Sequence, residues 1–85
     1  MIVMGFVVVN NTGKKTKITS PFGTETEIGL GETSRIFQGS GGSYQVVSGD
    51  TTIAEISLDY NGDPIVKQID KKANLKEITV SRIGY

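Results

Sequence analysis

The stretch Thr51–Gly62, "TTIAEISLDYNG", decides the fold class of this chain. Apolar and polar residues alternate along it with a period of two, which is typical of a half-buried β-strand. It ends in Asn-Gly, the strongest short-range signal for a two-residue hairpin turn. The alternation predicts an inward face formed by Ala54, Ile56, Leu58 and Tyr60. The opposite face is then expected to carry Ile53, Glu55, Ser57 and Asp59.

The composition extends this interpretation to the whole chain. The 85 residues include 10 Ile, 8 Val and 9 Thr, but only 2 Ala and 3 Leu. This balance favours strands, because β-branched residues are enriched in sheets while Ala and Leu are leading helix formers. The 11 glycines along the chain supply turns. We predict an all-β fold, a small antiparallel sandwich or barrel of about seven strands with little or no helix, in a single domain over residues 1–85.

The first strand, Ile2–Val9, is apolar on both faces, which is typical of a strand covered on both sides. Gly5 within it indicates a bulge or the close approach of another backbone. Domains of this size usually gain stability from a disulfide, a metal or a partner subunit. The chain has no cysteine and no histidine, which excludes disulfides and Cys/His zinc sites. We therefore predict a homo-oligomer with subunit contacts at Ile2, Val3, Phe6, Val7 and Val9, and with Ile53 or Ile83 as further candidates.

Catalytic machinery is largely excluded by the same composition. Without histidine or cysteine, Ser-His and Cys-His nucleophiles cannot be built, and no spacing marks a Ser-Lys pair. Two carboxylates across a cleft could hydrolyse a glycosidic bond, and Glu25 with Glu27 or Glu55 with Asp59 would share a strand face. A domain of this size has little room to enclose a sugar, so we predict solvated acids, no enzyme activity and no cofactor.

One short segment matches part of a calcium-binding pattern. Asp59, Asn61 and Asp63 occupy the first, third and fifth positions of an EF-hand-type loop. The sixth position is Pro64 instead of glycine, and the twelfth is Asp70 instead of glutamate. A hairpin turn explains every residue there, so we predict no metal site, with a weak calcium site as the alternative.

A Gly/Ser-rich stretch, Gln38–Ser43 or "QGSGGS", lies between two apolar runs. It precedes a predicted strand and matches neither the dinucleotide fingerprint nor the P-loop spacing. A plain hairpin connection is the favoured interpretation, and a loop ordered by a small anionic ligand is the alternative. The candidate ligand-binding residues are Arg35, Gly39, Ser40, Gly41, Gly42, Ser43 and Tyr44.

Charge and aromatic content argue against two classes of partner. Nine basic and nine acidic residues give a net charge of zero, and the three Phe and three Tyr are scattered. We therefore predict no binding to nucleic acid or to a membrane. The apolar N-terminal run has no basic region before it and no cleavage site after it, and the absence of cysteine fits a reducing compartment. The expected location is the cytoplasm.

These observations predict a non-catalytic binding or interaction protein that acts as a homo-oligomer. One alternative is a protein that sequesters a small anionic ligand, such as a nucleotide, near the Gly/Ser stretch at a subunit junction. Another alternative is a structural component of a phage or secretion assembly.

Overall fold

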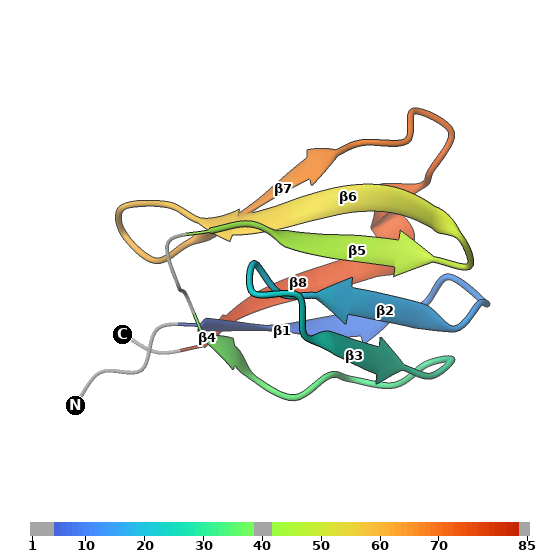
Figure 1. The fold of residues 1–85 in the computed structure, drawn as a ribbon, viewed down its shortest axis with the longest axis horizontal. Coiled ribbons are helices and arrows are strands. Elements are labelled where there is room, and N and C mark those ends of the chain that lie inside the picture. The colour runs from blue at the N-terminus through green and yellow to red at the C-terminus, as the bar shows by residue number, and fades with distance from the viewer. Residues whose placement is uncertain (1–4, 39–41, 84–85) are drawn as a thin grey trace.

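The computed structural model describes residues 5–38 and 42–83, and within them the chain forms eight strands in two antiparallel sheets (Figure 1). The strands are β1 (Gly5–Asn10), β2 (Thr16–Thr19), β3 (Glu25–Ile28), β4 (Phe37–Gln38), β5 (Tyr44–Ser48), β6 (Thr51–Leu58), β7 (Pro64–Gln68) and β8 (Ile78–Ile83). A single 3-10 turn, η1 (Leu75–Glu77), precedes β8. The prediction of a small antiparallel all-β domain of about seven strands is confirmed, and the two-residue β4 pairs with β1.

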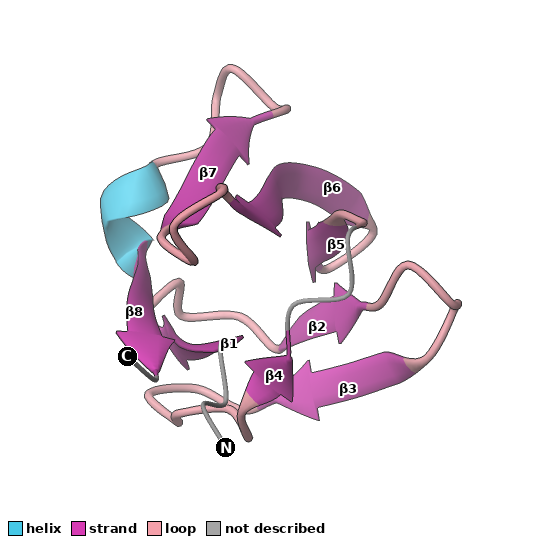
Figure 2. Cartoon of the chain, turned by 90° about the vertical axis from the view of Figure 1, so that its left-hand side faces the viewer, coloured by secondary structure: helices cyan, strands magenta, loops and turns pink. Residues whose placement is uncertain are grey.

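The two sheets enclose one interior. The larger sheet has the order β3-β2-β5-β6-β7 and the smaller one β4-β1-β8. Hairpins join β2 to β3, β5 to β6 and β6 to β7 within the larger sheet. The chain changes sheet between β1 and β2, β3 and β4, β4 and β5, and β7 and β8. Figure 2 shows the resulting arrangement, in which the strands of both sheets surround a common interior. The glycine of β1 allows close approach, because a Cβ on Gly5 would collide with the carbonyl oxygen of Phe37 in β4.

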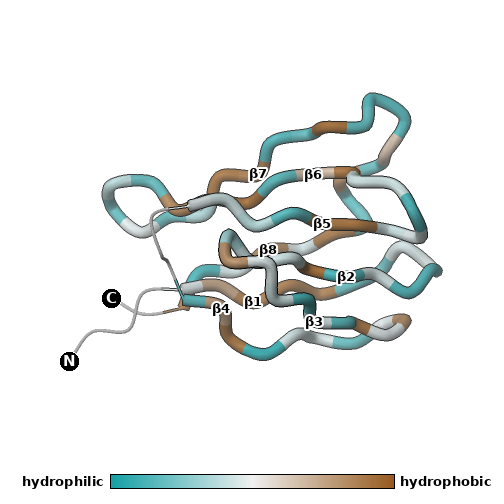
Figure 3. The backbone as a smooth tube through the Cα atoms, in the orientation of Figure 1, coloured by the Kyte–Doolittle hydropathy of each residue, from teal (hydrophilic) through white to brown (hydrophobic). Residues whose placement is uncertain are grey.

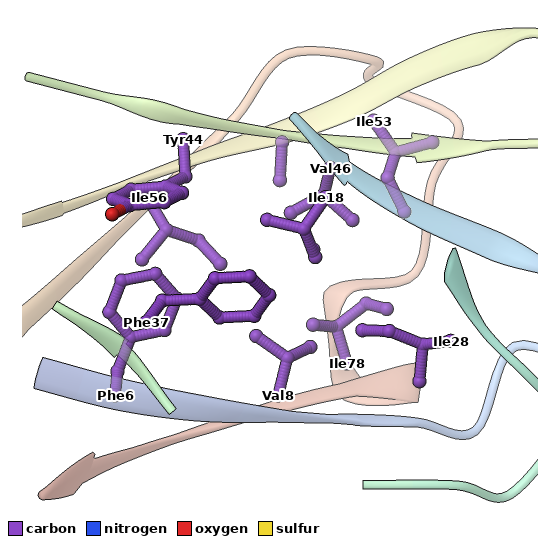
Figure 4. Packing of buried hydrophobic residues seen from close by; sticks show 11 residues of the cluster. Phe6, Val8, Ile18, Ile28, Phe37, Tyr44, Val46, Ile53, Ile56 and Ile78 are labelled. Atoms are coloured by element: carbon purple, nitrogen blue, oxygen red, sulfur yellow. The ribbon is translucent and has the colours of Figure 1, made fainter. Parts of the chain in front are cut away.

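The interior is apolar and the connections are polar. Figure 3 shows hydrophobic stretches along strands of both sheets, whereas most connecting turns are hydrophilic. The buried apolar residues come from both sheets and form one cluster: Phe6, Val8, Ile18, Ile28, Phe37, Tyr44, Val46, Ile53, Ala54, Ile56 and Ile78 (Figure 4). One continuous cluster of this kind is the mark of a single core.

Three aromatic rings fill one end of this core. The centroid of the Phe6 ring lies 5.4 Å from that of Phe37 and 5.1 Å from that of Tyr44. The Phe6 and Tyr44 rings meet edge to face at 87°. Such aromatic pairs add about 0.5–1.5 kcal/mol each beyond the burial of their area.

A buried amide occupies a different part of the interior, at the end of β1. The side chain of Asn10 is fully buried. Its Nδ2 donates to the carbonyl oxygens of Lys14 at 2.7 Å and Ile28 at 3.0 Å. Its Oδ1 accepts from the backbone N–H of Thr12 at 3.0 Å and from the Thr12 hydroxyl at 2.6 Å. Asn10 therefore ties the turn after β1 to the end of β3 in the opposite sheet.

The predicted faces of β6 need a correction at Ile53, which was predicted to face outward and is buried. Val46 of β5 pairs with Ala54, but the next residue, Val47, pairs with Thr52. Ile53 is the extra residue of a β-bulge, and bulges break the strict alternation of faces. Its side chain is only 7% exposed and joins the core, so it cannot serve the subunit contact predicted for it.

A second correction concerns Tyr60, which was predicted to face inward and is fully exposed. The strand ends at Leu58, and the next residue organises the turn. The Asp59 carboxylate accepts the backbone N–H groups of Asn61 at 2.8 Å and of Asp63 at 2.9 Å. The turn thus begins before Tyr60, and the Tyr60 side chain does not lie on either face of the sheet.

Candidate functional site

The described residues of the predicted ligand loop have structural partners. Gly39, Ser40 and Gly41 lie outside the described residues, and Ser43 is exposed. Gly42 packs against the turn after β2, where a Cβ would come within 2.7 Å of the Pro21 ring. Tyr44 is buried, and its hydroxyl donates to the carbonyl oxygen of Gln38 at 2.6 Å. This bond fastens the two ends of the Gly/Ser stretch to each other.

The Arg35 side chain contacts Phe37 and Thr26. Its guanidinium carbon lies 4.8 Å from the centroid of the Phe37 ring, a cation–π distance. Its Nη2 lies 3.4 Å from the hydroxyl of Thr26 on β3. Arg35 thereby covers the aromatic end of the core at the edge between β3 and β4. The structure brings Arg35 and Tyr44 to the same ring, Phe37, and of the two Tyr44 is buried while Arg35 stays exposed.

The subunit contacts predicted on the first strand divide into three groups. Ile2 and Val3 lie outside the described residues. Phe6 is fully buried among the aromatic rings, so its side chain has no surface to offer a second subunit, and the prediction for it is corrected. Val7 and Val9 are half-buried and lie on the outer face of the smaller sheet.

The strand register shows which residues share that face. Val7 pairs with Ser81 of β8, and Val9 pairs with Thr79. Ile36, next to β4, is 46% exposed, and alternation from the inward-facing Phe37 places it on the same side. We call this surface the uncharged face and define it by Val7, Val9, Ile36, Gln38, Thr79, Ser81 and Ile83.

The outer face of the larger sheet has the opposite character. The Lys17 ammonium lies 3.1 Å from the Glu25 carboxylate. Across the sheet, the Gln45 amide donates to the Glu55 carboxylate at 2.9 Å. The Lys17–Glu25 ion pair is solvent-accessible and contributes little to stability, whereas the Gln45–Glu55 hydrogen bond is partly buried. The seven residues of the uncharged face, by contrast, include no lysine, arginine, aspartate or glutamate.

Sequence reasoning missed most members of the uncharged face. Ile36, Gln38, Thr79 and Ser81 belong to segments far from β1 in the chain, and nothing local predicts their register with it. One sequence pattern could have predicted that the β8 residues belong to this face. The alternate positions 79, 81 and 83 are Thr, Ser and Ile, so one face of that strand carries no charge.

The metal alternative gains no support from the geometry. The part of the chain that is described holds no group of three or more Asp, Glu, His or Cys side chains able to share a metal ion. In the calcium-like segment, the Asp59 carboxylate accepts turn N–H groups, and Asp63 forms an ion pair with Arg82. The Asp59 carboxylate therefore has a structural role within the hairpin, and Asp63 links the hairpin to β8.

Comparisons with known proteins leave the site to be interpreted from its own geometry. No family model matches the chain, and neither the curated proteins nor the solved structures give a match. In residues 5–38 and 42–83, no helix is long and apolar enough to cross a membrane. The uncharged face is the surface on which a functional proposal can be built.

Proposed function

We propose that this protein is a non-catalytic interaction protein that self-associates through the uncharged face. The observation that carries the proposal is the absence of charge from a strand surface on which two valines are half-buried and Ile36 is 46% exposed. In a two-fold dimer each copy presents the same patch to the other. An uncharged patch meets its copy without like-charge repulsion and without desolvating an ion pair.

The size of the face places this association in a known class of interfaces. β1 and β8 each contain six residues, and at ~3.3 Å per residue such strands are ~20 Å long. Three strands spaced at ~4.8 Å cover ~14 Å, so the face measures about 300 Å² per subunit. Stable interfaces bury about 800 Å² per partner, which places this one in the weak and transient class. We expect a reversible dimer with a Kd of about 100 µM.

Sedimentation velocity tests the proposal across protein concentrations from about 10 µM to about 1 mM. The unmodified chain should shift from monomer to dimer within this range. Val7→Lys should remain monomeric, because dimerisation would bury an unpaired ammonium group against the partner.

The matched control is Val47→Lys. Val47 is also half-buried on the outer side of its sheet, but it lies beside Lys17 on the charged face. This variant should dimerise as the unmodified chain does. A chain that stays monomeric at about 1 mM, or a dimer weakened equally by both variants, contradicts the proposal.

Two further parts of the proposal rest on composition. A chain with neither histidine nor cysteine lacks the usual base and nucleophile of covalent catalysis, which supports a non-catalytic role. It also needs no oxidising compartment to fold, which supports a cytoplasmic location. Sequestration of an anionic ligand and assembly into a larger particle stay predictions. Ordered polymers under electron microscopy would favour the particle, because a two-fold contact closes at the dimer.

A further inference from the structure

A pocket of about 260 Å³ opens between three connections of the chain. The three connections lie at the same end of the sandwich (Figure 1). These are the turn between β1 and β2, the turn between β5 and β6, and the segment from β7 to β8. The nearly buried side chain of Ile53 lines the pocket, so the β-bulge contributes to its wall. None of its lining residues belongs to the uncharged face.

Backbone hydrogen bonds hold these connections in place. The N–H groups of Ile69 and Asp70 both donate to the carbonyl oxygen of Ile53, at 2.9 and 3.2 Å. On the other side, the N–H of Asn11 donates to the carbonyl oxygen of Glu77 at 2.8 Å. The segment after β7 is therefore anchored to both sheets, and the pocket is part of the folded framework.

The charges that line the pocket are balanced and unpaired. Lys14 and Lys72 contribute two ammonium groups, and Asp70 and Glu77 contribute two carboxylates. The three ion pairs within the described residues all involve other side chains, so none of these four charges is neutralised by a direct ion pair there. One Asp70 oxygen accepts the backbone N–H of Lys72 at 3.0 Å, which leaves the other available.

Balanced charges of both signs limit the chemistry of a ligand. A nucleotide or phosphate would face two carboxylates, and a divalent cation would face two ammonium groups. A molecule carrying one charge of each sign meets an opposite partner for both. The hydroxyl groups of Ser48 and Thr51 add neutral donors and acceptors. The volume lies below the ~300–1,000 Å³ of sites for drug-sized ligands, so the ligand must be small.

We propose that this pocket binds a small zwitterion of the free α-amino acid class. The ligand carboxylate pairs with Lys14 or Lys72, and the ligand ammonium group pairs with Glu77 and the free oxygen of Asp70. The proposal concerns a second surface and does not depend on dimerisation.

An NMR titration of the full chain, observed through its backbone amides, tests the proposal. The probes are glycine, alanine, serine, threonine, asparagine and glutamine. At least one should give saturable shifts at Lys14, Thr51 and Lys72, with a Kd of about 1 mM or tighter. The N-acetyl and the carboxamide derivatives of that amino acid each lose one charge. Each derivative should bind at least tenfold more weakly, because one pair of pocket charges loses its partner.

Two variants locate the binding, and each has a matched control. Lys72→Met and Glu77→Gln should each weaken the binding of the same amino acid at least tenfold. Lys67→Met on β7 and Glu27→Gln on β3 make the same chemical changes away from the pocket and should leave the affinity unchanged. The amide spectrum of each variant also shows that its fold is retained.

Three results would overturn the proposal. One is the absence of saturable shifts for every probe at about 20 mM, well above the expected Kd. The second is equal binding of the parent amino acid and a singly charged derivative, which would assign the pocket to a simple anion or cation. The third is saturable binding that the pocket variants and their controls affect to the same degree.

Discussion

The two faces of β1 are built from similar residues but meet different surroundings. Phe6 and Val8 point inward and are fully buried by the chain itself. Val7 and Val9 point outward and stay half-buried. An apolar side chain on a strand is therefore covered only where the rest of the fold supplies a second layer. The fold supplies that layer on one side of β1, and the other side is the one for which we propose a second copy of the chain.

The largest expected loss of stability comes from removing a buried ring at the aromatic end of the core. Phe6→Ala removes the ring that contacts both Phe37 and Tyr44. Loss of a buried Phe combines lost burial with a residual cavity and costs about 3–5 kcal/mol. Urea unfolding followed by circular dichroism should show this loss in the free energy of unfolding. Phe22→Ala, at a turn position that is 81% exposed, is the control and should change it by less than about 0.5 kcal/mol.

An intermediate effect is expected at the polar end of the same face. Asn10→Ala removes the side-chain donor that reaches the Ile28 carbonyl oxygen in a buried site, and it removes the acceptor of the Thr12 N–H and hydroxyl groups. Each unsatisfied buried group costs about 1–3 kcal/mol, so we expect a loss of about 2–4 kcal/mol in the same unfolding experiment. Asn11→Ala, which removes an exposed amide next to it, should stay within about 0.5 kcal/mol. Equal losses in the two variants would contradict a structural role for the Asn10 amide.

The smallest expected changes in stability compare the two faces of β1 most directly, because the same substitution is made on each face. Val8→Thr places a hydroxyl in the apolar core and should cost about 1–3 kcal/mol. Val9→Thr places it on the half-exposed outer face and should cost less than about 0.5 kcal/mol, since Thr also favours strands. The difference between the two midpoints of unfolding is the measurement. Similar losses would show that both faces are equally covered in the folded protein.

Local patterns were enough to predict much of the fold. The alternation of Thr51–Tyr60 correctly predicted a strand, which ends at Leu58, and the Asn-Gly pair correctly predicted a hairpin after it, although the connection runs over residues 59–63 instead of two residues. The burial of Ile53 could not be predicted, because the bulge depends on how β6 pairs with Val46 and Val47 of another strand. Tyr60 was misplaced because the Asp59 carboxylate ends the strand earlier than the alternation suggests.

The uncharged face and the pocket were harder to predict from the sequence. An apolar pattern on both faces of β1 predicts two covered sides but does not say which side is the core, which is why Phe6 was included among the subunit contacts. The neighbours of Val7 and Val9 on β8 follow from a register between segments about 70 positions apart. The pocket combines side chains from three connections, and no local spacing brings Lys14 near Lys72.

The hydrogen bond from Tyr44 to the Gln38 carbonyl has a practical consequence for protein engineering. It anchors the start of β5 to the end of β4, on either side of the Gly/Ser stretch. Added length between anchored ends costs only about 0.6 kcal/mol for each doubling of the loop. A foreign peptide grafted there would be displayed from a rigid base, so this chain could serve as a small cysteine-free scaffold for presenting binding epitopes.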